Sequence, residues 1–221
     1  MSNSGTKKDI AYQAIKKAII SGQLESAKIY SIKELAKIFN VSVTPGREAL
    51  VILASEGLIE PIPRIGYQVK SISVHDMLEI FHLRSILEVE GAGLAAERIA
   101  AGDIELLEAN NRLEKELVIS LQSDNSTHSY NEGYALNLEF HLTIARASGN
   151  HRLAEMVDKL QNESELVLGY DHHIARVEIA AAAAIQHYEI IERLRRRDKL
   201  GAQEAMKRHI EHAKNSSLNR F

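Results

Sequence analysis

The sequence predicts a mainly α-helical protein in which a small amino-terminal domain with a β-hairpin precedes a larger, all-helical domain. Two short helical patterns and an apolar hairpin pattern fall within residues 31–70, and helical periodicity runs almost without interruption from His75 onward. Apolar residues make up 45% of the 221 residues, so a core can form in each domain. We place the domains at residues 1–72 and 73–221.

The amino-terminal domain is predicted as three helices followed by a hairpin. Apolar residues recur at helical spacing in the first three segments, and two prolines and a glycine punctuate the fourth. These elements span residues 9–20, 31–39, 44–56 and 58–70. Two short helices, a tight turn and a β wing form a winged helix-turn-helix, whose second helix fits the major groove of DNA.

Candidate DNA-binding residues gather around the helix predicted over 44–56. Arg47, one turn into the helix, is the candidate for a guanine contact. Ser42 or Thr44 can cap the helix start, where free N–H groups also attract phosphate. Lys33 is expected at the DNA backbone, and Arg64 on the wing at a groove or a phosphate. The alternative for this shape is a protein-interaction module without DNA contacts.

The distribution of charge favours DNA binding by the amino-terminal domain. Residues 1–74 carry ten lysines or arginines and six acidic residues, a balance of +4. Residues 75–221 carry 17 and 24, a balance of −7, which gives the formal net charge of −3. A basic domain on an acidic body suits a domain that meets phosphates, although ordinary variation between domains is the alternative.

The composition also excludes several classes of protein. The chain has no cysteine, so disulfides and thiolate metal sites are excluded, as is usual in a reducing compartment. The start lacks the apolar run of a signal peptide, and the apolar stretch over 179–185 is too short to span a bilayer. We therefore expect a cytoplasmic protein without a membrane partner.

The second domain is predicted as an all-helical bundle of about six helices. Ser73 and Asn150 are candidate caps for two of them. On the second helix, the residues expected on the inward face are Leu106, Leu113, Leu117 and Leu121. In chain order the helices run from His75 to near Gly102, across Leu106–Leu121, over 129–148, from Asn150 to near Gly169, over 174–197, and from Gly201 onward.

Three histidines of the helical domain stand out by their spacing. Asn137 and His141 are four residues apart, so they share one helix face. His187 and His209 flank a predicted turn at residues 198–201, at roughly 18 and 15 Å from its centre, so antiparallel helices bring them to one level. One oxygen and three nitrogens could then hold zinc, nickel or manganese. The alternative is buried histidines that hydrogen-bond to neighbours.

The helix-turn-helix segments resemble the amino-terminal domain of the GntR family of bacterial transcription regulators. The resemblance lies in residues 31–36 (SIKELA), 41–50 (VSVTPGREAL) and 56–59 (EGLI). The family usually has an arginine that often touches DNA where Val43 stands. It usually has a bulky aliphatic residue where Gly46 stands. The resemblance implies DNA binding in the general manner of the family, and the two departures leave the operator sequence open.

Residues 75–221 resemble the FadR-type carboxy-terminal ligand domain, called FCD. The matching segments are residues 83–88, 94–96, 137–141, 147–150, His187 and 205–209. In metal-binding members an Asp or Asn and three histidines hold the ion. The metal ligands implied here are Asn137, His141, His187 and His209. Because all four are neutral, the ion would keep its full charge and attract an anionic effector strongly.

The sequence and the resemblance together predict a ligand-responsive transcription regulator. It would bind a near-palindromic double-stranded DNA operator as a homodimer and respond to a small organic acid. Open positions on the metal could take a carboxylate, with Arg84 as a second anchor, although an ion pair of Arg84 with Glu88 is an equal alternative. The rival function is a metal-dependent enzyme with a winged-helix recruiting module. The only acid inside the Asn137–His141 segment, Glu139, is two residues from each of them and so points elsewhere on the helix, and no other carboxylate is placed as a base.

Overall fold

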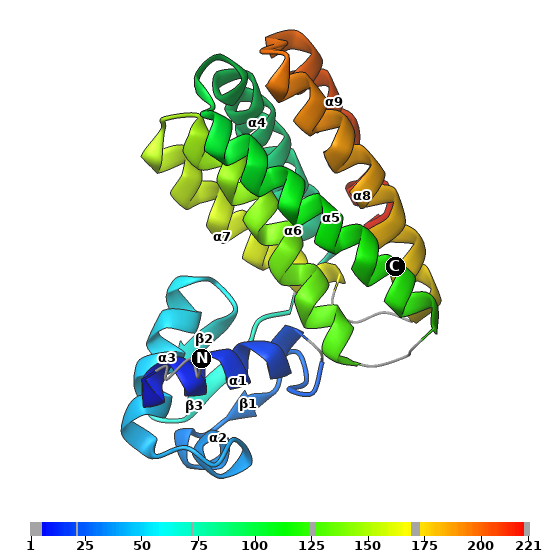
Figure 1. Cartoon of the computed structure of the whole chain (residues 1–221). Coiled ribbons are helices and arrows are strands. Elements are labelled where there is room, and N and C mark those ends of the chain that lie inside the picture. Colours follow the sequence, from blue (N-terminus) through cyan, green and yellow to red (C-terminus); the bar gives the residue numbers. More distant parts are fainter. Residues whose placement is uncertain (1–5, 21, 72, 124–126, 169–172, 219–221) are drawn as a thin grey trace. The chain divides into compact units, whose positions relative to one another are not determined.

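A computed structural model of the chain describes residues 6–20, 22–71, 73–123, 127–168 and 173–218. Within these ranges the chain forms helices and one small sheet, which confirms the mainly α-helical fold class. It divides into two compact units, and the second begins at Ser73. Figure 1 shows the sheet in the first unit and the helical bundle of the second. Among the described residues, no helix has both the length and the apolar character needed to cross a membrane.

The first unit is a winged helix-turn-helix. Its elements are α1 (Lys7–Ile20), β1 (Ile29–Tyr30), α2 (Ile32–Ile38), α3 (Val43–Ser55), β2 (Ile59–Ile62) and β3 (Gly66–Val69). The sheet is antiparallel with the order β1-β3-β2, so the predicted hairpin is present. The sequence analysis missed β1, which has only two residues and pairs Tyr30 with Tyr67.

The two helix starts of the helix-turn-helix differ in how they are capped. Ser31 forms a complete capping box with Glu34 at the start of α2. Ser42 holds the N-cap position of α3, but its side chain makes no capping hydrogen bond. The expectation that Thr44 could cap this helix is wrong, because α3 begins at Val43 and Thr44 lies inside its first turn. The hydroxyl of Ser42 is therefore not used by the helix it precedes.

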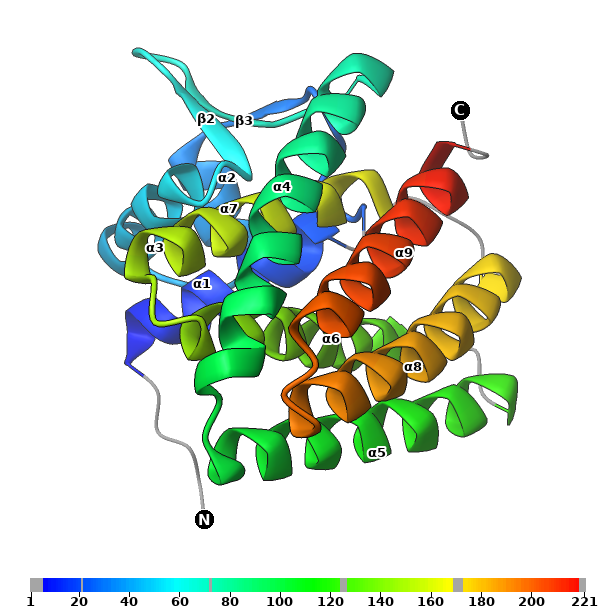
Figure 2. The same ribbon diagram turned by 90° about the horizontal axis from the view of Figure 1, so that it is seen from above.

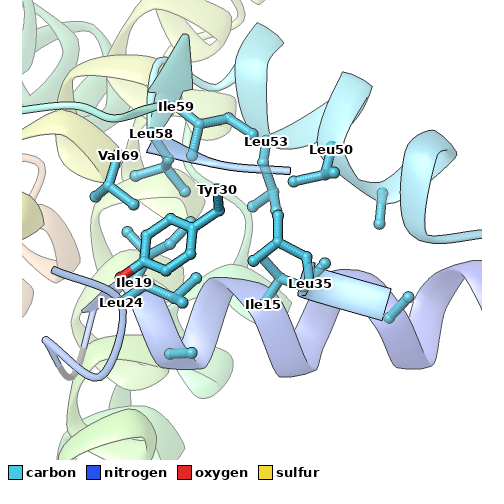
Figure 3. Packing of buried hydrophobic residues seen from close by; sticks show 13 residues of the cluster. Ile15, Ile19, Leu24, Tyr30, Leu35, Leu50, Leu53, Leu58, Ile59 and Val69 are labelled. Atoms are coloured by element: carbon cyan, nitrogen blue, oxygen red, sulfur yellow. The ribbon is translucent and has the colours of Figure 1, made fainter. Parts of the chain in front are cut away.

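A single apolar core holds the first unit together. Figure 3 shows side chains from α1, α3 and the sheet pointing into the same cluster. Tyr30 brings β1 into it, with its ring buried and its hydroxyl accepting a hydrogen bond from the backbone N–H of Glu25 at 2.9 Å. The fully buried members include Ile15, Ile19, Leu50, Leu53 and Leu58. This core fixes α3 and leaves its opposite face exposed.

The second unit is a bundle of six described helices. They are α4 (Val74–Arg98), α5 (Ala101–Ser123), α6 (Thr127–Ala147), α7 (His151–Leu168), α8 (His173–Arg195) and α9 (Lys199–Leu218). Helix α9 packs against α4 and α8, and α5 packs against α6 and α8, as Figure 2 shows. The predicted caps are confirmed, because Ser73 forms a capping box with Asp76 and Asn150 accepts from the N–H of Leu153 at 3.2 Å.

The turn between α8 and α9 lies before the predicted position at residues 198–201. Helix α8 ends at Arg195, and Arg197 then adopts a left-handed conformation with φ 54°. Asp198 then accepts a hydrogen bond from the backbone N–H of Gly201 at 2.9 Å, so α9 already begins at Lys199. A side-chain cap of this kind outweighs the low helix propensity of Gly201, which the sequence analysis took as the end of the turn.

The inward face of α5 also differs from the prediction. Leu106 is 63% exposed and Leu113 is 51% exposed, whereas Leu117 and Leu121 are buried as expected. The buried face instead contains Leu107, Asn110, Asn111 and Glu114. The helix is rotated so that polar groups enter the bundle, and hydrogen bonds inside the bundle stabilise them there.

Replacement of Gly46 by alanine should stabilise α3. An added Cβ would lie 3.5 Å from Ile32 Cδ1 and 3.6 Å from Val41 Cγ2, which is ordinary van der Waals contact. Because alanine has the higher helix propensity, we expect the free energy of unfolding to rise by about 0.5–1 kcal/mol. Urea unfolding of the whole chain measures this change. Gly66→Ala is the control that should destabilise, because its Cβ would collide with the backbone of Tyr30. A loss of stability in Gly46→Ala would contradict the prediction.

Candidate functional site

The predicted DNA-binding residues lie on the exposed side of the first unit. Ser42, Thr44 and Arg47 are exposed at the start of α3 and along its first turns. Lys33 is exposed in the first turn of α2. Arg64 is exposed in the hairpin turn, where it adopts φ 65°. A helix start with free N–H groups, an uncommitted hydroxyl and an exposed arginine is a surface that can meet phosphates and base edges.

Three histidines converge inside the second unit. His141 on α6, His187 on α8 and His209 on α9 are 1%, 0% and 4% exposed. Each offers one ring nitrogen, and these atoms all lie within 4.8 Å of one another. The Nε2 atoms of His141 and His209 are 3.2 Å apart. The ring of His187 stacks on the buried ring of Phe140, with centroids 3.7 Å apart.

The Nδ1 atom of each imidazole meets an acceptor. Nδ1 of His187 lies 2.9 Å from both carboxylate oxygens of Glu114, and Nδ1 of His209 lies 2.8 Å from the amide oxygen of Gln186. Nδ1 of His141 lies in close contact with a carboxylate oxygen of Glu88. Because an ionised carboxylate only accepts hydrogen bonds, Nδ1 must carry the proton in His141 and His187. Their Nε2 atoms then carry lone pairs.

The Nε2 atoms of the three imidazoles differ in the partners that they have. Nε2 of His187 is buried and has no hydrogen-bond partner among the described residues. Two Nε2 lone pairs only 3.2 Å apart, on His141 and His209, repel each other unless a proton or a metal ion lies between them. Two nitrogens bound to one tetrahedral zinc ion are about 3.3 Å apart. The three imidazoles could therefore hold a metal ion.

Glu88 connects three helices beside this cluster. It accepts from Arg84 Nε at 2.7 Å and from Gln161 Nε2 at 3.1 and 3.2 Å, in addition to its contact with His141. Burial by itself raises the pKa of Glu88, but the nearby Arg84 guanidinium and His141 imidazole outweigh burial and lower it to about 2. Glu88 is therefore ionised throughout the neutral pH range.

The pKa values of three other groups in the cluster, Glu114, His141 and His209, are also lowered. Burial raises the pKa of Glu114, but the charge and hydrogen bond of His187 prevail and lower it. Burial lowers the pKa of His141, against the opposing effect of Glu88. Burial and then His187 and His141 hold the pKa of His209 well below its ordinary value. His141 and His209 are therefore neutral near pH 7, which is the state that binds metals.

The two remaining predicted residues, Asn137 and Arg84, lie on α6 and α4. Asn137 is half-buried on α6, one turn before His141. Arg84 is buried and pairs with Glu88, as the alternative interpretation of the sequence had it, and its Nη1 also donates to Ser164 Oγ at 3.1 Å. Glu114 was not predicted from the sequence, because the inward face expected for α5 passed through Leu113. Glu114 shares the buried face of α5 with Leu107, Leu117 and Leu121, and this helical spacing is the signal in the sequence that could have identified it.

Two family models together cover most of the chain. Residues 7–69 match the model described as "Bacterial regulatory proteins, gntR family", and residues 79–212 match the FCD domain. The chain belongs to the GntR family and carries an FCD domain. This confirms both resemblances found in the sequence. GntR regulators bind DNA operators and are typically dimers.

Known relatives of this GntR regulator agree with the family assignment. The HTH-type transcriptional repressor GlaR of Escherichia coli is 28% identical over 205 residues, which cover 90% of each chain. The gluconate operon transcriptional repressor of Bacillus subtilis is 32% identical over 158 residues, covering 71% of this chain and 60% of the relative. The solved structure of E. coli McbR/YncC shares the fold with a TM-score of 0.76 and 20% identity, covering 98% of this chain and 99% of that one.

These matches identify the protein as a ligand-responsive transcription regulator and not an enzyme. The rival metalloenzyme prediction is therefore wrong. The geometry agrees, because Glu139, the acid that the sequence places between Asn137 and His141, is exposed. Its carboxylate accepts a hydrogen bond from Arg146 on the same helix at 3.1 Å and does not approach the imidazoles as a base would.

Proposed function

We propose that this regulator binds a near-palindromic operator as a homodimer through residues 1–72. In this proposal, residues 73–221 bind a divalent metal ion and a small organic acid. The observation that carries the proposal is the cluster of three buried imidazoles, which offer one nitrogen each within 4.8 Å of one another. A twofold protein dimer reads two half-sites, so the operator should have matching symmetry.

DNA recognition would start from the exposed face of α3. Arg47 would contact a base edge, while Ser42 and Thr44 at the helix start would hold a phosphate. Lys33 and Arg64 would contact the backbone or an adjacent groove. The support is their common exposure and the +4 balance of residues 1–74, because binding to the phosphate backbone needs positive charge.

Replacement of Arg47 by alanine should weaken operator binding by about 1–3 kcal/mol, because a base contact is lost. Titration of labelled operator at several salt concentrations measures the change. Arg112→Ala is the matched control, since Arg112 is also exposed but lies on α5 in the helical unit. If Arg47→Ala kept both its affinity and its salt dependence, the role given to Arg47 would be wrong.

The metal site would consist of His141, His187 and His209, with the side-chain oxygen of Asn137 as a fourth ligand. Imidazole nitrogens with one oxygen suit zinc, nickel or manganese. When bound, the ion would supply a positive charge that a carboxylate can approach. Arg84 would be the second anchor of that carboxylate, through its Nη2 group, since its hydrogen bonds within the protein use Nε and Nη1.

His141→Ala and His187→Ala should each abolish stoichiometric metal binding, because each removes one of the converging nitrogens. Metal content after dialysis against a trace of zinc measures the loss. His82→Ala is the control, because His82 is exposed on α4. Full metal retention by both His141→Ala and His187→Ala would rule out this assignment.

A carboxylate effector should raise the melting temperature of the metal-loaded protein, because a ligand that binds only the folded state stabilises it. A panel of small mono- and dicarboxylates, with zinc or with a chelator, identifies such a ligand. The same compound should change operator affinity, since regulation requires different effector affinity in the two DNA-binding states. A compound that stabilises the protein equally with and without metal would argue against an effector site on the ion.

A further inference from the structure

Two buried acids contact the Nδ1 atoms of two imidazoles in the cluster. Glu88 is 3% exposed and Glu114 is 8% exposed, and among the described residues they are the only buried acids. Each contacts the Nδ1 atom of one histidine, Glu88 that of His141 and Glu114 that of His187. Burying a carboxylate is costly, so both must be compensated locally.

The buried charges around the cluster sum to a negative value when the imidazoles are neutral, and a metal ion or a proton on the imidazoles would balance them. Among the buried residues that the structure describes, Arg84 is the only lysine or arginine, and it pairs with Glu88. With neutral imidazoles, two carboxylates and one guanidinium leave one net negative charge inside the bundle. Within the described part of the chain, the partners of Glu114 are His187 and the amide of Asn111 at 3.1 Å, with no lysine or arginine among them. The carboxylates that carry this negative charge lie at the Nδ1 atoms, on the other side of the imidazole rings from the Nε2 atoms.

The third histidine differs from the other two. Nδ1 of His209 meets the amide oxygen of Gln186, which is an uncharged acceptor. A carboxylate at Nδ1 makes an imidazole more basic and a better metal ligand, whereas an amide oxygen only orients it. The chain therefore contains, within one cluster, two histidines held by carboxylates and one held by an amide.

We propose that Glu114 and Glu88 are positioning residues for a divalent metal ion. They fix His187 and His141 in the tautomer that turns Nε2 toward the centre, and they supply negative charge that balances the ion. This inference rests on the proposed metal function. It assigns a role to two residues that do not themselves touch the metal.

Glu114→Gln is the direct test, because glutamine keeps the shape and an acceptor oxygen but removes the charge. Changes in groups that orient a metal-ligating histidine weaken metal binding by about 10–100-fold. We expect a loss of this size in zinc affinity, measured by competition with a chromophoric chelator. Glu116→Gln, an exposed change on the same helix, should leave the affinity unchanged. Glu88→Gln is less suitable, because it would leave the buried Arg84 without its counter-charge.

Gln186→Glu supplies the opposite change, since it places a third carboxylate behind His209. We expect tighter zinc binding in this variant, and Glu114→Gln combined with Gln186→Glu should return toward the affinity of the original chain. A purely structural role of Glu114 would not show this reciprocity. The melting temperatures of the metal-free variants, measured in chelator, separate changes in folding from changes in affinity.

The tautomer is measured without metal, from the side-chain ¹⁵N chemical shifts of His187. The original chain should show a protonated Nδ1, and Glu114→Gln should show a mixture of tautomers. Unchanged zinc affinity in Glu114→Gln, or weaker binding in Gln186→Glu, would overturn the positioning role while the metal site stands. Failure of the original chain to bind zinc, nickel or manganese would instead overturn the proposed metal function.

Discussion

The buried carboxylate of Glu88 is the constraint on which the arrangement of the helical unit depends. A carboxylate removed from water is tolerated only where charged and hydrogen-bonding groups replace the solvent. Glu88 receives such groups from three helices, Arg84 of α4, His141 of α6 and Gln161 of α7. Because all three must reach the same two oxygens, this group fixes the position of α6 and α7 along α4. The placement of His141, and with it the geometry of the histidine cluster, follows from the same requirement.

The position of Glu88 on α4 bears on how the protein could respond to a ligand. Helix α4 is the first element of the helical unit, and its cap at Ser73 follows the wing of the first unit within a few residues. In the proposed function, an ion bound by His141 changes the charge that Glu88 faces. Any adjustment of the contacts between Glu88, Arg84 and Ser164 then acts on α4 and α7. Coupling requires only that two arrangements of these contacts differ in ligand affinity.

The sequence predicted the winged unit and the convergence of the three histidines, because both depend on local patterns. Helical spacing placed α2 and α3, and the spacing of Asn137 and His141 identified one helix face. The two-residue strand β1 has no periodicity to detect, since its pairing with β3 is a tertiary contact. Glu114 was missed for a different reason. Leucines on α5 suggest an inward face through Leu106 and Leu113, but burial is decided by which polar groups find partners inside, and Asn111 and Glu114 do.

The two buried acids also change the electrostatic character expected for the site. From its ligands alone the site was expected to keep the full charge of the ion, and so to attract an anionic effector strongly. Glu88 and Glu114 lie directly behind two of those ligands, and only Arg84 opposes them among the buried residues. Much of the charge of a divalent ion would then be neutralised inside the bundle. The acids would thus favour retention of the metal more than attraction of the effector. An organic acid would need specific hydrogen bonds, in addition to the field of the ion, to be selected from the other anions of a cell.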